Sequence, residues 1–196
     1  MARKKRINKK MLVSMFIIAI MVLSAFGFIF SYQTSQPSEK LDDYKGHEFK
    51  KTAKGYTTEI NDQKLYFDYY PGDLEQINIT EDTRAILSQS EVFVITYDPN
   101  SDFAESIAEK EFDLEQKTGK TGKPLIAKGL TNATGYALPQ ITCKNATKEM
   151  PVIRMKRGKT SEIKTDKNCI IIEAETEPIL NTFYTRVLYI IFGVMN

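Results

Sequence analysis

The two cysteines, Cys143 and Cys169, are the residues whose type could do redox or metal chemistry, and the 196-residue chain has no others. Their separation of 26 positions matches neither the CxxC pair of thiol oxidoreductases nor a zinc site. A zinc site needs further cysteine or histidine close by, and His47 is the single histidine. We therefore predict one structural disulfide between Cys143 and Cys169 in an oxidising compartment. An extracytoplasmic thiol-disulfide protein is the alternative, and it requires one exposed cysteine with a reactive thiolate.

Carboxylates are abundant, with 25 Asp and Glu, but no pair stands out as a catalytic couple. The chain also has no GxSxG nucleophile elbow and no HExxH metal motif. Asp68, Asp98 and Glu173 fall near predicted strand ends, and Asp98 follows the most apolar strand, where open α/β sheets place their crevices. We interpret Asp98-Pro99 as a turn. A carboxylate-based envelope hydrolase is an alternative that requires two acids facing one cleft. The sequence predicts no catalytic residue, no cofactor and no metal ligand, and favours a protein that is not an enzyme.

Residues 119–123, GKTGK, contain the glycine and lysine residues of phosphate-binding loops. A P-loop leaves a strand and enters a helix, so that backbone N–H groups at the helix N-terminus face the phosphates. Here the glycines follow a predicted helix and precede a predicted strand, and Pro124 comes next. We interpret the segment as the C-terminal end of a helix.

Residues 11–31 determine which compartment these side chains meet. Met11 to Phe30 are twenty residues without a charge, and a helix rising about 1.5 Å per residue covers the roughly 30 Å hydrocarbon core of a bilayer. Six Lys and Arg precede this stretch with no acid among them, which predicts a cytoplasmic N-terminus. A cleaved signal peptide is the alternative, since residues 25–27, AFG, offer small side chains to a signal peptidase.

The chain therefore divides by composition into four segments. Residues 1–10 form a basic cytoplasmic tail, residues 11–31 a transmembrane helix, residues 32–45 a polar linker, and residues 46–196 an extracytoplasmic α/β domain. Beyond the tail, 21 Lys and Arg face 25 Asp and Glu, a net charge of −4. That balance excludes nucleic acid as an expected partner, because phosphate binding relies on clustered basic side chains.

The pattern after residue 46 predicts an α/β fold. HEFKKT, GYTTEI and KLYFDYY alternate with period two around the turn residues 61–63, which indicates an N-terminal β-hairpin or meander. Residues 91–99 form a nearly continuous apolar run, expected of an inner strand at the sheet's centre. The following helix, 102–117, has Asp102 and Glu105 spaced as in a capping box, and a strand at 124–127 completes a parallel βαβ unit.

Further elements follow from the same signals. Thr80 is suited to cap a short helix, strands are expected at 150–156, 162–164 and 168–174, and the segment from Thr176 reads as a helix that is apolar almost all round. We predict a small mixed, partly parallel sheet with an N-terminal β-hairpin, covered by helices and preceded by one transmembrane helix.

Four side chains are candidates for an interaction surface: Tyr66, Tyr70, Tyr184 and Arg186. Tyr66 and Tyr70 share one face of a predicted strand, where aromatic rings form either a binding strip or a two-sided core. The C-terminal helix is either core or a surface that docks on a partner or membrane. If the helix is buried, Arg186 needs a carboxylate or solvent.

Three sequons, beginning at Asn78, Asn132 and Asn145, all lie in the predicted outer domain. They make these asparagines possible glycosylation sites. Asn78 is next to a predicted strand and Asn145 is beside a cysteine, where a glycan meets steric hindrance. We expect Asn132 to be the most accessible acceptor.

The basic tail, the single span and a TCKNAT, PVI, NCIII arrangement within residues 142–174 resemble the uncharacterised single-pass membrane-anchored proteins of small-genome archaea. That resemblance implies fold and location and supplies no catalytic residue. We expect a binding or accessory module without catalytic activity, held in the cell membrane by residues 11–31. Its expected partner is a membrane or envelope protein at the outer face.

Overall fold

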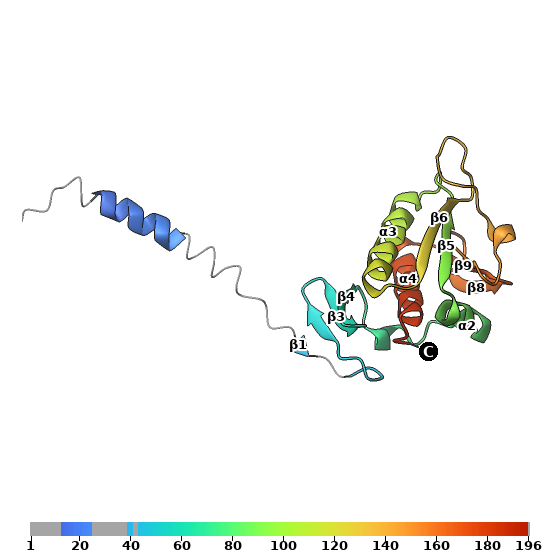
Figure 1. Ribbon diagram of the computed structural model, residues 1–196, viewed down its shortest axis with the longest axis horizontal. Helices are drawn as coiled ribbons and strands as arrows, with labels where there is room; N and C mark the ends of the chain where they lie inside the picture. The colour runs from blue at the N-terminus through green and yellow to red at the C-terminus, as the bar shows by residue number, and fades with distance from the viewer. Residues whose placement is uncertain (1–12, 25–38, 41–42, 196) are drawn as a thin grey trace, which may run out of the picture. The chain divides into compact units, whose positions relative to one another are not determined.

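The computed structural model describes residues 13–24, 39–40 and 43–195, in two separate units, 1–38 and 39–196 (Figure 1). Residues 13–24 are helical, with exposed side chains that include Phe16 and Leu23. Across the described ranges, no helix is both long enough and apolar enough to cross a bilayer. Both ends of the predicted span 11–31 and the whole of the predicted tail 1–10 lie outside the described residues.

The first sheet of unit 39–196 is an antiparallel meander in the order β1-β2-β3-β4. Its strands are β1 (Glu39–Lys40), β2 (Lys50–Thr52), β3 (Gly55–Ile60) and β4 (Gln63–Phe67). Asn61 and Asp62 turn β3 into β4 with φ of 51° and 59°, the left-handed values of a type I′ hairpin turn. The predicted hairpin is confirmed. The meander also takes in the end of the predicted linker 32–45, because β1 pairs with β2 through backbone bonds that composition does not reveal.

The second sheet is mixed, in the order β6-β5-β7-β9-β8. Its strands are β5 (Val92–Tyr97), β6 (Leu125–Leu130), β7 (Val152–Arg157), β8 (Glu162–Asp166) and β9 (Cys169–Ala174). All neighbours are parallel except β8, which pairs antiparallel with β9. The predicted βαβ unit and partly parallel sheet are confirmed. The central strand is β7, not residues 91–99 as predicted, because two strands follow β7 and both add to its side of the sheet.

Three α-helices and two short 3₁₀ helices, η1 (Pro71–Leu74) and η2 (Cys143–Asn145), complete the unit. Thr80 caps α2 (Glu81–Gln89) as predicted, with its side chain accepting the N–H of Thr83. Helix α3 (Ala104–Thr121) ends at Gly122 with φ of 83°, so GKTGK is a helix C-terminus. The third is α4 (Glu177–Ile191).

The predicted capping box at the start of α3 is wrong. The N-cap is Phe103, which makes no side-chain cap bond. The Asp102 carboxylate instead forms an ion pair with Arg157 at the end of β7, and the Arg157 guanidinium lies 5.6 Å from the Phe103 ring. Asp102 therefore pairs with Arg157, which is distant in the sequence, and does not cap the start of α3 as the local sequence pattern predicts.

The two faces of the mixed sheet have different covers. Helices α3 and α4 lie on one side of the strands in Figure 1, and the segment 131–151 before β7 lies on the other. The helix side buries Phe93, Ile95, Ile153, Met155, Ile170 and Ile172. The opposite side buries Val94, Val152 and Cys169 under Ile141 and Cys143. On this second face, Ile141 packs directly against the backbone of β6 at Gly129. A larger residue there would clash, since a Cβ on Gly129 would lie 2.8 Å from Cβ of Ile141.

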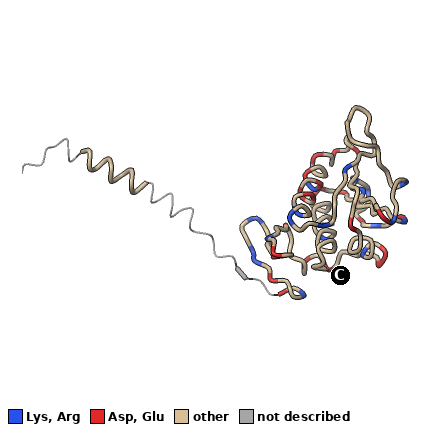
Figure 2. The backbone as a smooth tube through the Cα atoms, in the orientation of Figure 1, with Lys and Arg blue, Asp and Glu red and all other residues tan. Residues whose placement is uncertain are grey.

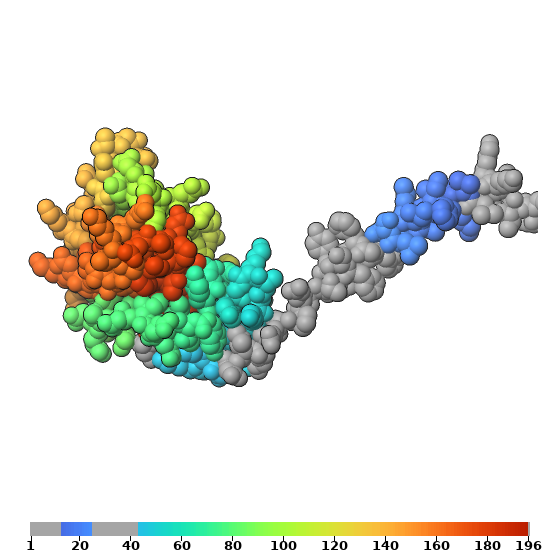
Figure 3. All heavy atoms as spheres, turned by 180° about the vertical axis from the view of Figure 1, so that it is seen from behind, coloured from blue at the N-terminus to red at the C-terminus, as the bar shows by residue number. Residues whose placement is uncertain are grey.

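Helix α4 is the core helix of the unit. Eight of its residues are buried, and it contacts β9, α2, α3 and η1. The Tyr189 ring stacks on Phe67 of the meander with centroids 4.4 Å apart, so α4 also ties the two sheets together. Figure 3 shows the red C-terminal segment between the orange strand residues and the green and cyan residues that precede β5. The structure therefore supports the interpretation of the C-terminal helix as part of the core.

Candidate functional site

A small cleft of about 170 Å³ opens where the end of β4 meets α3 and α4. Its walls combine aromatic rings with charged groups from three segments that lie far apart in the sequence. The lining residues are Tyr66, Phe67, Asp68, Glu109, Lys110, Asp113, Lys117, Asn181, Tyr184, Thr185 and Leu188. A space of this size accommodates a few water molecules or one side chain of a partner.

Tyr184 forms the buried wall of the cleft, with only 5% of its surface exposed. Its hydroxyl oxygen lies 2.8 Å from the carbonyl oxygen of Lys110 and 2.8 Å from Oδ2 of Asp113. One O–H donates to one of these acceptors at a time. Burial first, and then the Asp113 charge, raise the pKa of Tyr184 well above its usual value, so the hydroxyl stays protonated.

Two lysines of α3 are fixed beside this tyrosine. Lys117 pairs with Asp113, and its ammonium lies 5.7 Å from the centroid of the Phe67 ring. Lys110 donates to Oγ of Ser106 at 3.3 Å. Burial lowers the pKa of Lys110, against four nearby carboxylates that raise it, namely Asp68, Glu109, Glu177 and Asp113.

Acids outnumber bases at the mouth of the cleft. Lys117 is neutralised by Asp113, which leaves the acids Asp68 and Glu109 beside the half-buried Lys110 in the lining of the cleft. Glu177 does not line the cleft, but its charge raises the pKa of Lys110. Figure 2 shows acidic residues distributed along α3. The Asp68 carboxylate is held in place by the side-chain amide of Asn181, at 2.8 Å. The resulting negative field attracts a cationic group and repels an anionic one.

Of the four predicted interaction residues, the structure brings Tyr66 and Tyr184 together in this cleft. Burial, followed by the charge of Asp68, raises the pKa of Tyr66. Tyr70 lies elsewhere, in a ring cluster in which its centroid is 5.5 Å from Phe49. Arg186 is 5% exposed and therefore does not lie on an open surface.

The other acids considered in the sequence have structural partners. Oδ1 of Asp98 accepts the N–H of Asn100 at 3.0 Å, which is the predicted turn. Glu173 accepts from Lys156 at 2.6 Å and lies 3.7 Å from Lys164. Within residues 13–24, 39–40 and 43–195 no group of three His, Cys, Asp or Glu is placed to hold a metal ion.

Sequence reasoning missed Lys110, Asp113 and Lys117. Asp113 and Lys117 have the i, i+4 spacing of a helical ion pair, which was the available signal. What the spacing did not reveal is burial, since Lys117 is only 7% exposed. Buried lysines are rare, so a buried lysine such as Lys117 on a helix that packs against a sheet indicates a polar site and not a solvent-exposed helix face.

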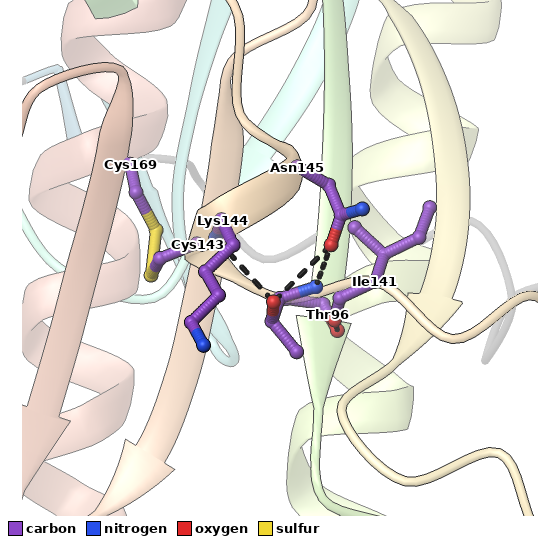
Figure 4. Close-up of a disulfide and its surroundings, with 7 residues drawn as sticks. Thr96, Ile141, Cys143, Lys144, Asn145 and Cys169 are labelled. Carbon is purple, nitrogen blue, oxygen red and sulfur yellow. Dashed lines mark hydrogen bonds between the residues drawn. A yellow bond between two sulfur atoms is a disulfide. The ribbon is translucent and has the colours of Figure 1, made fainter.

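The predicted disulfide between Cys143 and Cys169 is present, with Cα atoms 5.2 Å apart (Figure 4). Cys169 at the start of β9 is completely buried, and Cys143 begins η2. The turn before it is held by Asn145, whose Oδ1 accepts the N–H of Thr142 at 2.9 Å. The bond therefore attaches segment 131–151 to the sheet.

The three sequons differ in their surroundings. The Asn145 side chain caps η2, so its amide already has a structural role. Oδ1 of Asn132 accepts the N–H of Thr134 at 3.2 Å in an exposed loop, and Asn78 is exposed before the cap of α2. Glycosylation at any of the three stays a prediction.

Comparison of the chain with protein-family models, with curated proteins and with solved structures found no match. The resemblance to archaeal membrane-anchored proteins therefore stays a prediction.

Proposed function

We propose that this protein is a membrane-anchored, extracytoplasmic binding module without catalytic activity, and that its cleft receives a cationic side chain of a membrane or envelope protein. The apolar stretch 11–31 and the basic residues before it support anchoring with the C-terminal unit outside. The disulfide supports an oxidising compartment.

The single observation that carries the binding role is the arrangement of the cleft. Its rings and charged groups are positioned before any partner arrives, because Tyr184, Asp113 and Lys117 hold one another and Asn181 holds Asp68. A preformed pocket with an excess of acid at its mouth binds a lysine or arginine side chain without first ordering its own groups.

The two alternative functions fit the geometry less well. Asp68 and Asp113 face one cleft, as a carboxylate-based hydrolase requires, but both serve as hydrogen-bond acceptors for neighbouring side chains. A thiol-disulfide exchange protein needs an accessible sulfur. Cys169 is 0% exposed and Cys143 is partly buried, and the bond between them attaches a structural segment.

The test places a photo-reactive benzoyl-phenylalanine at Tyr66 in the full chain in its native membranes. The matched control places the same group at Tyr136, which is 52% exposed in the loop after β6 and outside the cleft. Irradiation should give one discrete adduct from position 66 and not from position 136. The partner residue in the adduct, located by mass spectrometry, should lie beside a lysine or arginine.

Charge variants make the assay specific. Asp68→Asn with Glu109→Gln should lower the adduct yield at least fivefold, because both remove negative charge at the mouth. Glu105→Gln is the matched control, since this exposed acid lies on α3 but does not line the cleft. Equal adducts from positions 66 and 136, or equal losses from both sets of charge variants, would refute the proposal.

A further inference from the structure

Strand β8 is the outer strand of the mixed sheet, and its outer edge is open. No described strand pairs with that edge, since β8 ends the order β6-β5-β7-β9-β8 (Figure 1). A hollow of about 650 Å³ lies along it and is lined by all of residues 161–165. Their side chains alternate between the two faces of the sheet, so a hollow that touches all five lies at the edge itself. The opposite wall comes from segment 76–82 and Phe183, and no lining residue is shared with the cleft.

The strand register shows which backbone groups face this hollow. In β9, the carbonyl oxygens of Asn168 and Ala174 accept N–H groups at either end of β7, at 3.1 and 3.0 Å. Backbone direction alternates along a strand, so the odd-numbered residues of β9 turn their bonds toward β8. Those residues pair with the even-numbered residues of β8. Ile163 and Thr165 therefore direct both their N–H and their C=O outward, where no described backbone group bonds to them.

The charges along this edge are unevenly matched within one copy. Glu162 of β8 lies directly opposite Glu173 of β9, and like charges at opposite positions destabilise an antiparallel pair. Lys164 pairs with Glu162 and lies 3.7 Å from Glu173, so one exposed lysine serves both acids from this strand. Lys156 of β7 is the other partner of Glu173. The row across the sheet is therefore Lys156, Glu173 and Glu162, and its outer end beside Glu162 is open to a further cation.

We propose that the outer edge of β8 is a homodimer interface, in which the β8 strands of two copies pair antiparallel about a two-fold axis at Ile163. The segment 161–165, SEIKT, is complementary to itself in this arrangement. Glu162 of each copy faces Lys164 of the second copy, which supplies the missing cation. Ile163 faces its own counterpart and Ser161 faces Thr165. These are the odd-numbered positions, whose outward N–H and C=O groups then bond across the interface.

The charge pattern also selects this register over its neighbours. A shift of the two strands by one residue would oppose an outward-facing backbone position to an inward-facing one and break the hydrogen bonds. A shift by two residues keeps the hydrogen bonds, but it places Glu162 opposite Glu162 or Lys164 opposite Lys164. Only the register centred on Ile163 satisfies both the backbone and the charges. The contact is short, so we expect a weak dimer.

The test measures the dimer dissociation constant of the full chain in mild detergent by sedimentation equilibrium. The protein is made in a host that adds no glycans, because Asn78 lines the hollow. Glu162→Lys alone and Lys164→Glu alone should each raise the dissociation constant by about tenfold or more, because each variant opposes like charges at two symmetry-related positions. The double variant restores opposite charges across the interface, and so does an equimolar mixture of the two single variants. Both should return to the constant of the unmodified chain.

Lys123→Glu is the matched control. This exposed lysine comes just before β6, at the opposite edge of the sheet, so its substitution should leave the dissociation constant unchanged. A full chain that stays monomeric up to about 0.1 mM would leave the edge to a strand from a different protein and overturn the proposal. It is also overturned if both single variants dimerise as the unmodified chain does, or if neither the double variant nor the mixture recovers.

Discussion

Opening the Cys143–Cys169 bond should lower the stability of unit 39–196 by about 3.5 kcal/mol. The bond closes a loop of 26 residues, and the chain-entropy relation gives this value at 25 °C. For a unit of this size each kcal/mol corresponds to about 2–4 °C, so the melting temperature should fall by about 7–14 °C. The effect should be local at first, because the loop supplies the cover of one sheet face.

The assay compares thermal unfolding of the full chain in mild detergent with and without a phosphine reductant. Near-ultraviolet circular dichroism follows the buried tyrosines, and maleimide mass tags count free thiols before each melt. The double variant Cys143→Ala with Cys169→Ala should melt with the reduced chain and ignore the reductant. Trypsin should cut the reduced chain first at Lys144 and Lys148, which are exposed in the released segment.

Two results would refute this reasoning. If the native chain takes up two tags before reduction, the cysteines are not paired and the oxidising compartment loses its support. If the reduced chain, with two tags confirmed, melts within about 2 °C of the oxidised chain, side-chain contacts such as those of Ile141 hold segment 131–151 without the bond.

Four further predictions concern single side chains, each measured by urea unfolding. Gly158→Ala should cost about 1–3 kcal/mol, because its Cβ would lie 1.8 Å from Oε1 of Glu173, and this cost should at least halve in a Glu173→Ala background. The pKa of Glu173 is lowered, chiefly by its bond from Lys156, so the stability it contributes is lost as pH falls below 4.5, and Glu173→Gln should remove that dependence. Burial raises the pKa of Glu111, so stability is lost as pH rises above 4.5, and Glu111→Gln should flatten that limb. Tyr184→Phe should cost about 1–2 kcal/mol by leaving a cleft acceptor without its donor, whereas no loss would show that the hydroxyl is dispensable.

Local signals in the sequence predicted most of the fold. The alternation of Leu65 and Phe67 with Tyr66, the cap at Thr80 and the helix end at Gly122 each depend on residues within one turn or strand. The order of the strands was less accessible. Residues 91–99 read as the centre of the sheet because they are apolar on both faces, but any inner strand has that pattern.

The cleft was beyond a local interpretation. Its acids, amide and lysines come from β4, α3 and α4, and only the packing of α4 against the meander brings Asp68 to Asn181, 113 positions away. The same holds for Asp102, whose partner Arg157 is 55 positions away. Spacing rules describe neighbours on one element and carry no information about which elements meet.

Because α4 follows every other described element in the sequence, it is the last of them to emerge during synthesis, and this affects when the unit can fold. Every other element of unit 39–196 is complete before residues 177–191 appear, yet the apolar side of the sheet and the meander both close on that helix. A nascent chain ending before α4 thus exposes Phe67, Ile170 and Ile172 to whatever surrounds it. The strands therefore stay open to aggregation until α4 packs on them.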